Sequence, residues 1–198
     1  MRRVILSMMV SLDGMIAKSD GDLEWFLTDD QLESEMLELL KDVDGYLFGR
    51  VAYQLLSQYW PTAGKSDEEA PGGFTSKERE IEFARLMNEK PKIVFSRSSP
   101  ELSWKPAQLV SGDLAAEVAR LKAQPGKDLA LFAGASIAGA FMNLDLVDEY
   151  RLMVHPIALG KGLPLFGDLT AERRFALHSA RTLPSGVVLL RYERDEKA

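Results

Sequence analysis

The stretch LALFAGASIAG, residues 129–139, changes at Gly134 from a bulky apolar run to small residues. The apolar part has the length and composition of a buried strand, and residues 135–143 are predicted to form a helix. A strand that passes through a glycine into a helix is one half of a βαβ unit. The free N–H groups at such a helix start can hold a phosphate group, although a tight turn followed by a serine cap would produce the same sequence.

The same alternation continues along the whole chain and predicts an α/β fold. Strands are expected at 3–10, 44–49, 91–96, 107–110, 128–133 and 148–159, and helices at 29–42, 50–58, 75–88, 111–124 and 135–143. The first strand is a near-continuous apolar run, which is typical of a strand buried on both faces. Two further strands, at 174–183 and 187–194, flank the turn residues PSG and predict an antiparallel hairpin, so the sheet is mixed.

Polar residues mark the expected helix starts and loops. The predicted caps are Thr28 and Thr75, each followed three residues later by Gln31 or Glu78, and Ser111. The segment 11–25 is rich in glycine and aspartate and is expected to be a loop. The stretch WPTAGKSDEEAPGGF at 60–74 is rich in proline, glycine and charge, which indicates a surface loop that could act as a flap.

The composition limits the class of protein. A chain of 198 residues with 46% hydrophobic and 27% charged residues is predicted to form one domain, residues 1–198. The absence of cysteine rules out disulfides and thiolate metal sites and suits the cytoplasm. The net charge of −6 argues against a nucleic-acid partner, and no apolar run approaches the ~20 residues of a membrane span. The start MRRVILSMMV has no cleavage site and is interpreted as a strand, not a signal peptide.

Three predicted strands end in a similar way: YLFGR at 46–50, IVFSR at 93–97 and ALFAG at 130–134. Ligands of open α/β sheets bind beyond the carboxyl ends of the strands, where small residues let them approach the backbone. Arg50 and Arg97 are suited to phosphate groups. A serine and an arginine after the third strand favour NADP over NAD, because an acidic residue there would favour a bare 2′-hydroxyl. An exposed arginine would explain each position taken singly.

Five stretches resemble the dihydrofolate-reductase-like superfamily: VSLDGMIA, DGYLFGRVAY, KIVFSRS, LFAGASIAGAF and LVDEYRLMVHPIALGKGLPLFGD. They are most similar to stand-alone relatives of the C-terminal reductase domain of the riboflavin-biosynthesis deaminase-reductase. The resemblance covers nearly the whole chain in order. It implies a three-layer αβα fold with a mixed, mostly parallel sheet of about eight strands that binds NADPH across the carboxyl edge.

The resemblance also assigns a cofactor site. The residues implied are Ile16 and Ala17 beside the nicotinamide, Gly49 and Arg50 at the pyrophosphate and adenosine phosphate, Ser96 and Arg97 at the adenosine-phosphate end, and Gly134, Ala135, Ser136 and Ile137 at the pyrophosphate turn. Dihydrofolate reductases carry a second glycine where Ala135 stands, and usually a threonine where Ala52 stands. The Ala52 difference leaves one cofactor contact open.

On the substrate side, the segment 18–25 corresponds to the loop that closes over the nicotinamide in this superfamily. Asp13, Trp25 and His155 are the candidate substrate-binding residues. A plain connecting loop with one buried aromatic ring and a structural histidine would explain the same pattern. The GKG at 160–162 either attracts a substrate phosphate or forms an ordinary turn.

The proton donor is sought at the start of the first long helix, where Asp29, Asp30 and Glu33 lie near the matching turn. Asp30 is the candidate. A metal site is not expected, because two separated histidines and no cysteine form no ligand cluster.

These observations predict a cytoplasmic NADPH-dependent reductase of a small heterocyclic substrate, similar to 5-amino-6-(5-phosphoribosylamino)uracil reductase. Two alternatives stay open: reduction of dihydrofolate or another pterin, and a dinucleotide-binding module without catalysis. A homodimer is expected, because the predicted sixth strand and the hairpin leave sheet edges that need cover.

Overall fold

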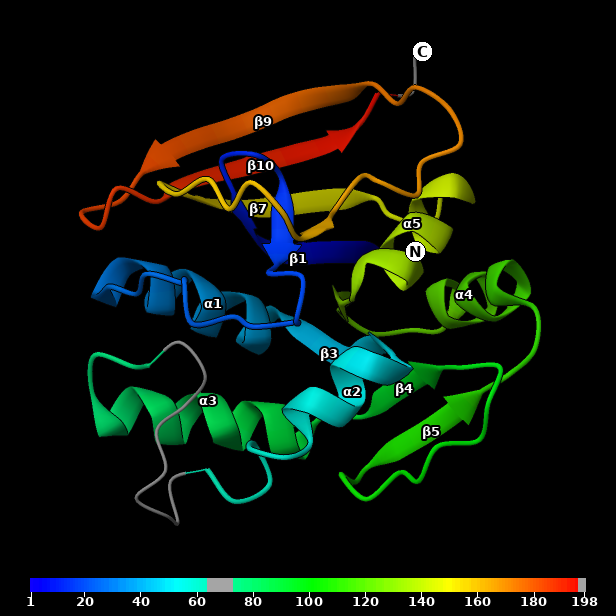
Figure 1. Cartoon of the computed structure of the whole chain (residues 1–198). Helices are drawn as coiled ribbons and strands as arrows, with labels where there is room; N and C mark the ends of the chain where they lie inside the picture. The colour runs from blue at the N-terminus through cyan, green and yellow to red at the C-terminus, as the bar shows by residue number, and fades with distance from the viewer. Residues whose placement is uncertain (64–72, 196–198) are drawn as a thin grey trace.

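The computed structural model describes residues 1–63 and 73–195 (Figure 1). The strands in this part are β1 (Val4–Ser11), β2 (Met15–Ala17), β3 (Val43–Gly49), β4 (Lys92–Phe95), β5 (Ala107–Val110), β6 (Asp128–Phe132), β7 (Glu149–His155), β8 (Leu163–Pro164), β9 (Phe175–Thr182) and β10 (Val188–Arg194). The helices are α1 (Asp30–Asp42), α2 (Arg50–Leu56), α3 (Lys77–Glu89), α4 (Leu114–Ala123) and α5 (Ala135–Asn143). Most of the predicted flap, residues 64–72, lies outside the described residues.

Eight strands form one mixed sheet in the order β5-β4-β3-β6-β1-β7-β10-β9. The neighbours from β5 to β7 are parallel, whereas β10 runs antiparallel to both β7 and β9. The sequence prediction of a mostly parallel sheet that ends in an antiparallel hairpin is therefore confirmed.

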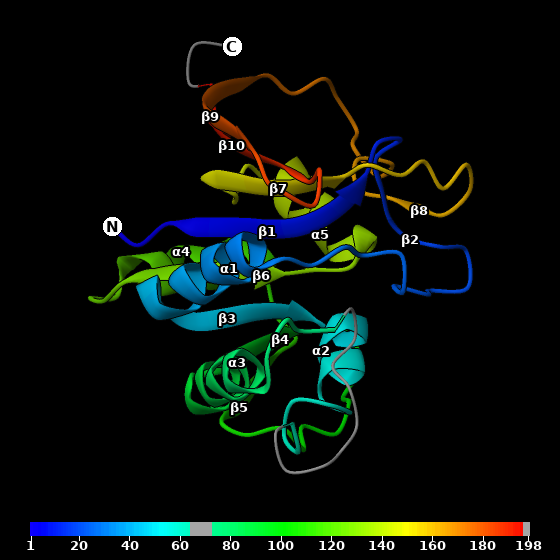
Figure 2. The same cartoon turned by 90° about the vertical axis from the view of Figure 1, so that its left-hand side faces the viewer.

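Helices cover both faces of this sheet, with α1 and α3 on one side and α4 and α5 on the other (Figures 1 and 2). Successive residues of the inner strands serve different layers: Leu47 packs in the cluster with α4 and α5, whereas Tyr46 and Phe48 pack in the cluster with α1 and α3. Each fully buried side chain of this size contributes about 2 kcal/mol. This two-sided burial explains why the strands are near-continuous apolar runs.

The chain after β1 is more regular than the sequence indicated. Within the segment expected to be a loop, β2 forms and pairs antiparallel with β8, Ala17 facing Leu163. The predicted strand at 148–159 is wrong at its end, because β7 stops at His155, where its partner β1 stops at Ser11. Residues 156–162 leave the sheet, and the chain then returns through β8.

The helix starts also differ from the prediction. The observed caps are Asp29, Ser76 and Asp113, in place of Thr28, Thr75 and Ser111. Each observed cap is the last extended residue before the helix and accepts an N–H of its first turn. Each helix therefore begins one or two residues later than the predicted cap would place it.

The sheet has its edges at β5 and β9. The strand at 148–159 was predicted to leave an open edge together with the hairpin. Its observed counterpart, β7, is not at an edge, because it lies between β1 and β10. No helix in the described part of the chain is both long enough and apolar enough to cross a membrane.

Candidate active site at the carboxyl edge of the sheet

Six neighbouring parallel strands, β5, β4, β3, β6, β1 and β7, end at one edge of the sheet. Figure 2 shows these ends directed toward α2 and the small β2–β8 pair. The connections after β3 and β6 lead to opposite faces, to α3 and to α5. Sheets of this type bind ligands where neighbouring connections diverge in this way. The three strand ends compared in the sequence, those of β4, β3 and β6, are thus neighbours.

Two helices start side by side here without a side-chain cap. Gly49 precedes α2 and Gly134 precedes α5, and neither offers an acceptor to the first N–H groups of its helix. A Cβ on Gly49 would lie 2.7 Å from Cγ2 of Ile137 in α5, so the two helix starts are in contact. A Cβ on Gly134 would meet nothing within 4 Å, and its φ of −84° suits any residue. Neither the backbone nor a protein neighbour therefore requires glycine at position 134.

Two exposed arginines follow these strand ends. Arg50 begins α2 and donates to the Gln54 amide oxygen at 2.9 Å, and Arg97 follows β4. Neither guanidinium pairs with a carboxylate among the residues that the structure describes. Beside Arg97, the Ser96 hydroxyl lies 3.0 Å from that of Ser98. Ala135 is partly buried and Ser136 exposed in the first turn of α5. The region therefore carries positive charge that the described chain does not neutralise.

The edge continues from β6 to β1 and β2. Ile16 and Ala17 are buried in β2, and a Cβ on Gly162 would lie 2.3 Å from the Ala17 carbonyl oxygen. Gly160 has a φ of +73°, a conformation that glycine adopts readily. Both glycines of the GKG turn thus have a structural reason, and Lys161 between them is exposed.

Asp13 holds this turn in place. Its carboxylate accepts the Ser11 hydroxyl at 2.5 Å and the N–H groups of Leu159 and Gly160 at 3.1 and 2.7 Å. These hydrogen bonds, that from Ser11 being the strongest, lower the pKa of Asp13 to about 2. The side chain predicted to bind substrate is therefore ionised and engaged with its own chain.

Trp25 and His155 meet at the end of β7. Both are buried, and their ring centroids are 5.4 Å apart in an edge-on arrangement. The N–H of Leu27 donates to Nδ1 of His155 at 3.1 Å. Nε2 of His155 and Nε1 of Trp25 are both buried with no hydrogen-bond partner in the described structure. Such unpaired groups cost about 1–3 kcal/mol each, so they mark a place where the fold is not optimised for stability alone.

His155 is neutral at ordinary pH. Burial lowers its pKa to about 4, because the charged ring would lose its hydration. Since Nδ1 accepts a hydrogen bond, the single ring proton lies on Nε2. The other histidine, His178, is exposed on β9, away from this edge.

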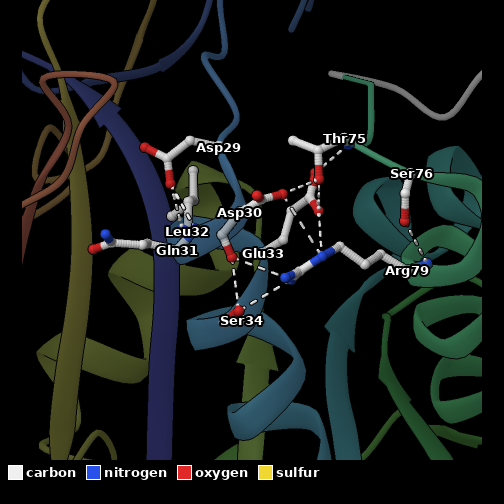
Figure 3. A network of polar contacts seen from close by, with 9 residues as sticks. All are labelled: Asp29, Asp30, Gln31, Leu32, Glu33, Ser34, Thr75, Ser76 and Arg79. Atoms are coloured by element: carbon white, nitrogen blue, oxygen red, sulfur yellow. Dashed lines mark hydrogen bonds and ion pairs between the residues drawn. The ribbon is translucent and has the colours of Figure 1, made fainter.

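The three acidic residues at the start of α1 have different surroundings (Figure 3). Asp29 caps the helix and also accepts the Ser185 N–H at 2.9 Å. Burial would raise its pKa, but these hydrogen bonds outweigh burial and lower the pKa below its usual value. Asp30 is exposed and accepts the Thr75 hydroxyl at 2.6 Å. The carboxylate of Asp29 is therefore occupied by structural hydrogen bonds, whereas that of Asp30 is exposed to solvent.

Glu33 is the third acid and is 1% exposed. It accepts the Thr75 N–H at 2.6 Å and the Thr75 hydroxyl at 2.7 Å, and Arg79 lies 3.6 Å away (Figure 3). This network joins α1 to the start of α3. No sequence pattern indicates this network, because Thr75 fits a helix cap equally well. In the described residues, no group of three or more His, Cys, Asp or Glu side chains is arranged to hold a metal ion.

Comparison with known proteins gives matches over almost the whole chain. The family model described as the RibD C-terminal domain matches residues 2–189. The uncharacterized protein YyaP of Bacillus subtilis (strain 168) is 37% identical over 191 residues, covering 96% of this chain and 94% of YyaP.

Solved structures share the fold. A protein assigned to riboflavin biosynthesis from Shewanella sp. PV-4 is 25% identical with a TM-score of 0.75, over 99% of this chain and 100% of that one. The diaminohydroxyphosphoribosylaminopyrimidine deaminase/5-amino-6-(5-phosphoribosylamino)uracil reductase of Thermotoga maritima is 19% identical with a TM-score of 0.68, over 98% of this chain and 57% of that one. Dihydrofolate reductase from Enterococcus faecalis, solved with NADP(H), is 10% identical with a TM-score of 0.62, over 98% and 97%. The expected resemblance to the C-terminal domain of the riboflavin-biosynthesis deaminase-reductase and the expected fold are confirmed.

Proposed function

Because the chain belongs to the RibD C-terminal domain family of reductases, we propose that it is an NADPH-dependent reductase of a small heterocyclic substrate. One observation carries the proposal: three neighbouring strand ends bring two uncapped helix starts to one edge of the sheet, with two arginines that no carboxylate of the described residues neutralises. Helix starts and arginines are the groups that bind phosphates in proteins.

The residues of this edge fit the cofactor. A Cβ on Gly134 would meet no described atom within 4 Å, so the chain leaves the start of α5 open to a pyrophosphate, with Ala135, Ser136 and Ile137 in the same turn. Gly49 and Arg50 flank it from β3, and Ser96 and Arg97 lie one strand further, where a ribose-linked phosphate would bind. Ile16 and Ala17, in β2 on the other side, would lie beside the nicotinamide. When bound, NADPH supplies the hydride.

The substrate position follows from the order of the strands. Beyond β1 and β2 the edge continues to β7, where the indole N–H of Trp25 has no hydrogen-bond partner among the described residues. A heterocycle with a carbonyl or ring-nitrogen acceptor would pair with this donor. Asp30, exposed at the start of α1, is the acid proposed to supply the proton, and Asp13 contributes by fixing the neighbouring turn.

We propose 5-amino-6-(5-phosphoribosylamino)uracil, or a close ribosylaminopyrimidine, as the substrate class. The chain matches 57% of the Thermotoga maritima deaminase/reductase in fold. A pterin is the second substrate candidate. A dinucleotide-binding module without catalysis is favoured by one observation, namely that the carboxylate of Asp30 contacts Thr75 and Arg79.

The deciding experiment follows NADPH consumption by the purified protein with ribosylaminopyrimidine, dihydrofolate and no added substrate. Consumption with the ribosylaminopyrimidine supports the proposal, and consumption with dihydrofolate alone supports the pterin reading. Tight NADPH binding without turnover on either compound supports the module.

We also propose a cytoplasmic homodimer. β9 is an edge strand, and nearly all its residues are exposed, with Leu177 57% exposed. A second copy paired along this edge would cover it. Sedimentation of the purified protein measures the mass of the particle, and a monomer across micromolar concentrations would reject this proposal.

A further inference from the structure

The segment 18–26, between β2 and α1, is organised by its own residues. Lys18 pairs with Asp22 at 2.5 Å, and the N–H of Lys18 donates to the Asp22 carbonyl at 3.1 Å. Asp20 and Asp22 accept further N–H groups within the segment, and Phe26 donates to Leu23. Among the described residues, the hydrogen bonds and ion pairs of 18–26 all stay inside that segment.

His155 provides the polar link from the end of this segment to the sheet. The N–H of Leu27 donates to Nδ1 of His155, which ends β7. The imidazole also stacks on Phe26, with centroids 5.5 Å apart, and meets the edge of Trp25. The imidazole is fully buried, so these contacts replace solvent around it.

The chemical state of the ring suits this role. Nδ1 can accept the Leu27 N–H only while it carries no proton, and burial keeps the ring neutral. Burial is the cause of the lowered pKa of His155. The burial of the ring therefore keeps Nδ1 unprotonated and able to accept the Leu27 N–H.

We propose that His155 is a positioning residue that holds the segment 18–27 against the end of β7, by accepting the Leu27 N–H and packing against Trp25 and Phe26. It acts on the substrate through Trp25, which it keeps beside the substrate position. The role in orienting substrate rests on the proposed reductase function. The attachment of the segment 18–27 to β7 through His155, called the tether below, does not.

Two substitutions distinguish the loss of the hydrogen-bond acceptor from the loss of the ring. His155→Phe keeps a planar ring and removes the acceptor, while His155→Asn places an amide oxygen near the position of Nδ1 and keeps it. Amide hydrogen exchange is measured on peptides that cover 23–29, with peptides covering β3 and β6 as internal controls.

We expect the Leu27 amide to exchange at least about tenfold faster in His155→Phe, with β3 and β6 unchanged, and within about threefold of the wild type in His155→Asn. Trypsin should also cleave after Lys18, an exposed residue of the segment, faster in His155→Phe alone. Unchanged protection in His155→Phe, or equal acceleration in both variants, overturns the proposal. Faster exchange in β3 and β6 as well would show a general loss of stability and would overturn it too.

The enzymatic readout distinguishes this proposal from the proposed function. With an active wild type, His155→Phe should raise the substrate KM about tenfold and the NADPH Kd by much less, whereas His155→Asn should keep a KM close to that of the wild type. An NADPH Kd that rises in step with the KM would contradict the positioning role. A wild type without turnover would reject the reductase assignment, while the exchange result would still decide the tether.

Discussion

Gly49 and Ile137 are in direct contact, so that a Cβ at position 49 would stand 2.7 Å from Ile137 Cγ2. Gly49 ends β3 and Ile137 lies in the first turn of α5, so this contact fixes two helix starts relative to each other. Both starts lack side-chain caps and face the same edge of the sheet. The geometry of the proposed pyrophosphate site thus depends on a glycine that does not need to touch the ligand.

Gly49→Ala should therefore lower the free energy of unfolding by about 1–3 kcal/mol, the usual cost of inserting a methyl group into a packed site. The backbone at position 49 has φ −81° and ψ 160°, which alanine adopts, so the cost comes from Ile137. Urea unfolding measures it. In the double variant Gly49→Ala/Ile137→Ala the clash is removed, and additive losses would contradict the account.

Gly134→Ala should behave in the opposite way. The position has room for a methyl group and an ordinary backbone, so the free energy of unfolding should stay within about 1 kcal/mol of the wild type or rise slightly. NADPH affinity should fall about tenfold, because the methyl group would stand where the backbone approaches the pyrophosphate. Fluorescence titration measures the affinity. Unchanged affinity would show that Gly134 serves only the turn.

The acid at the start of α1 can be assigned by comparing Asp30→Asn with Glu33→Gln. If Asp30 supplies the proton, Asp30→Asn lowers kcat about a hundredfold and leaves the NADPH Kd unchanged. Glu33 is buried between Thr75 and Arg79, so Glu33→Gln should lower the free energy of unfolding by about 1–3 kcal/mol while folded protein keeps its kcat. The reverse pattern, a large kcat loss in Glu33→Gln alone, would move the role to Glu33.

The low pKa of His155 predicts how stability depends on pH. The ring titrates at about 4 in the folded chain and near 6.5 in the unfolded chain. Between these values only the unfolded chain takes up the proton, so the free energy of unfolding falls as the pH falls through this window, by at most roughly 3 kcal/mol. His155→Asn lacks this term, and its deficit relative to the wild type should shrink toward about pH 4.

The matched control for this experiment is His178→Asn, because His178 is exposed on β9. Chemical unfolding at several pH values between about 4 and 6.5 measures the free energy of unfolding of the wild type, His155→Asn and His178→Asn. A deficit of His155→Asn that stays constant with pH would contradict a buried neutral ring, and a pH-dependent effect of His178→Asn would show that the window belongs to another group.

Much of the fold could be predicted from the sequence, because the signal came from burial on both faces of the strands. The helix 135–143 and the strand 107–110 match α5 and β5 to the residue. The strands β2 and β8 were missed, since they are two or three residues long and form only by pairing with each other. The end of β7 was also missed, because the apolar run passes beyond His155 although its partner β1 has ended.

The candidate site was predictable where it depends on strand ends and not where it depends on side-chain partners. Glycine and arginine after Phe48 mark a βα junction, and the structure places that junction next to those of β4 and β6. Three contacts join distant segments: Gly160 donates to Asp13, Ser185 donates to Asp29, and Thr75 donates to Glu33. Local residue spacing in the sequence does not predict contacts of this kind.

The central claim is that the edge formed by β4, β3 and β6 binds NADPH, and titration of NADPH and NADH into the purified protein tests it most directly. Arg50→Ala and Arg97→Ala are compared with Arg174→Ala, a matched loss of charge at a remote exposed position. We expect NADPH to bind more tightly than NADH, and each edge variant to weaken NADPH about ten- to a hundredfold, as loss of a charged hydrogen bond implies, with Arg174→Ala unchanged. No binding of either nucleotide at millimolar concentration, or equal NADPH affinity in all three variants and the wild type, would contradict the account.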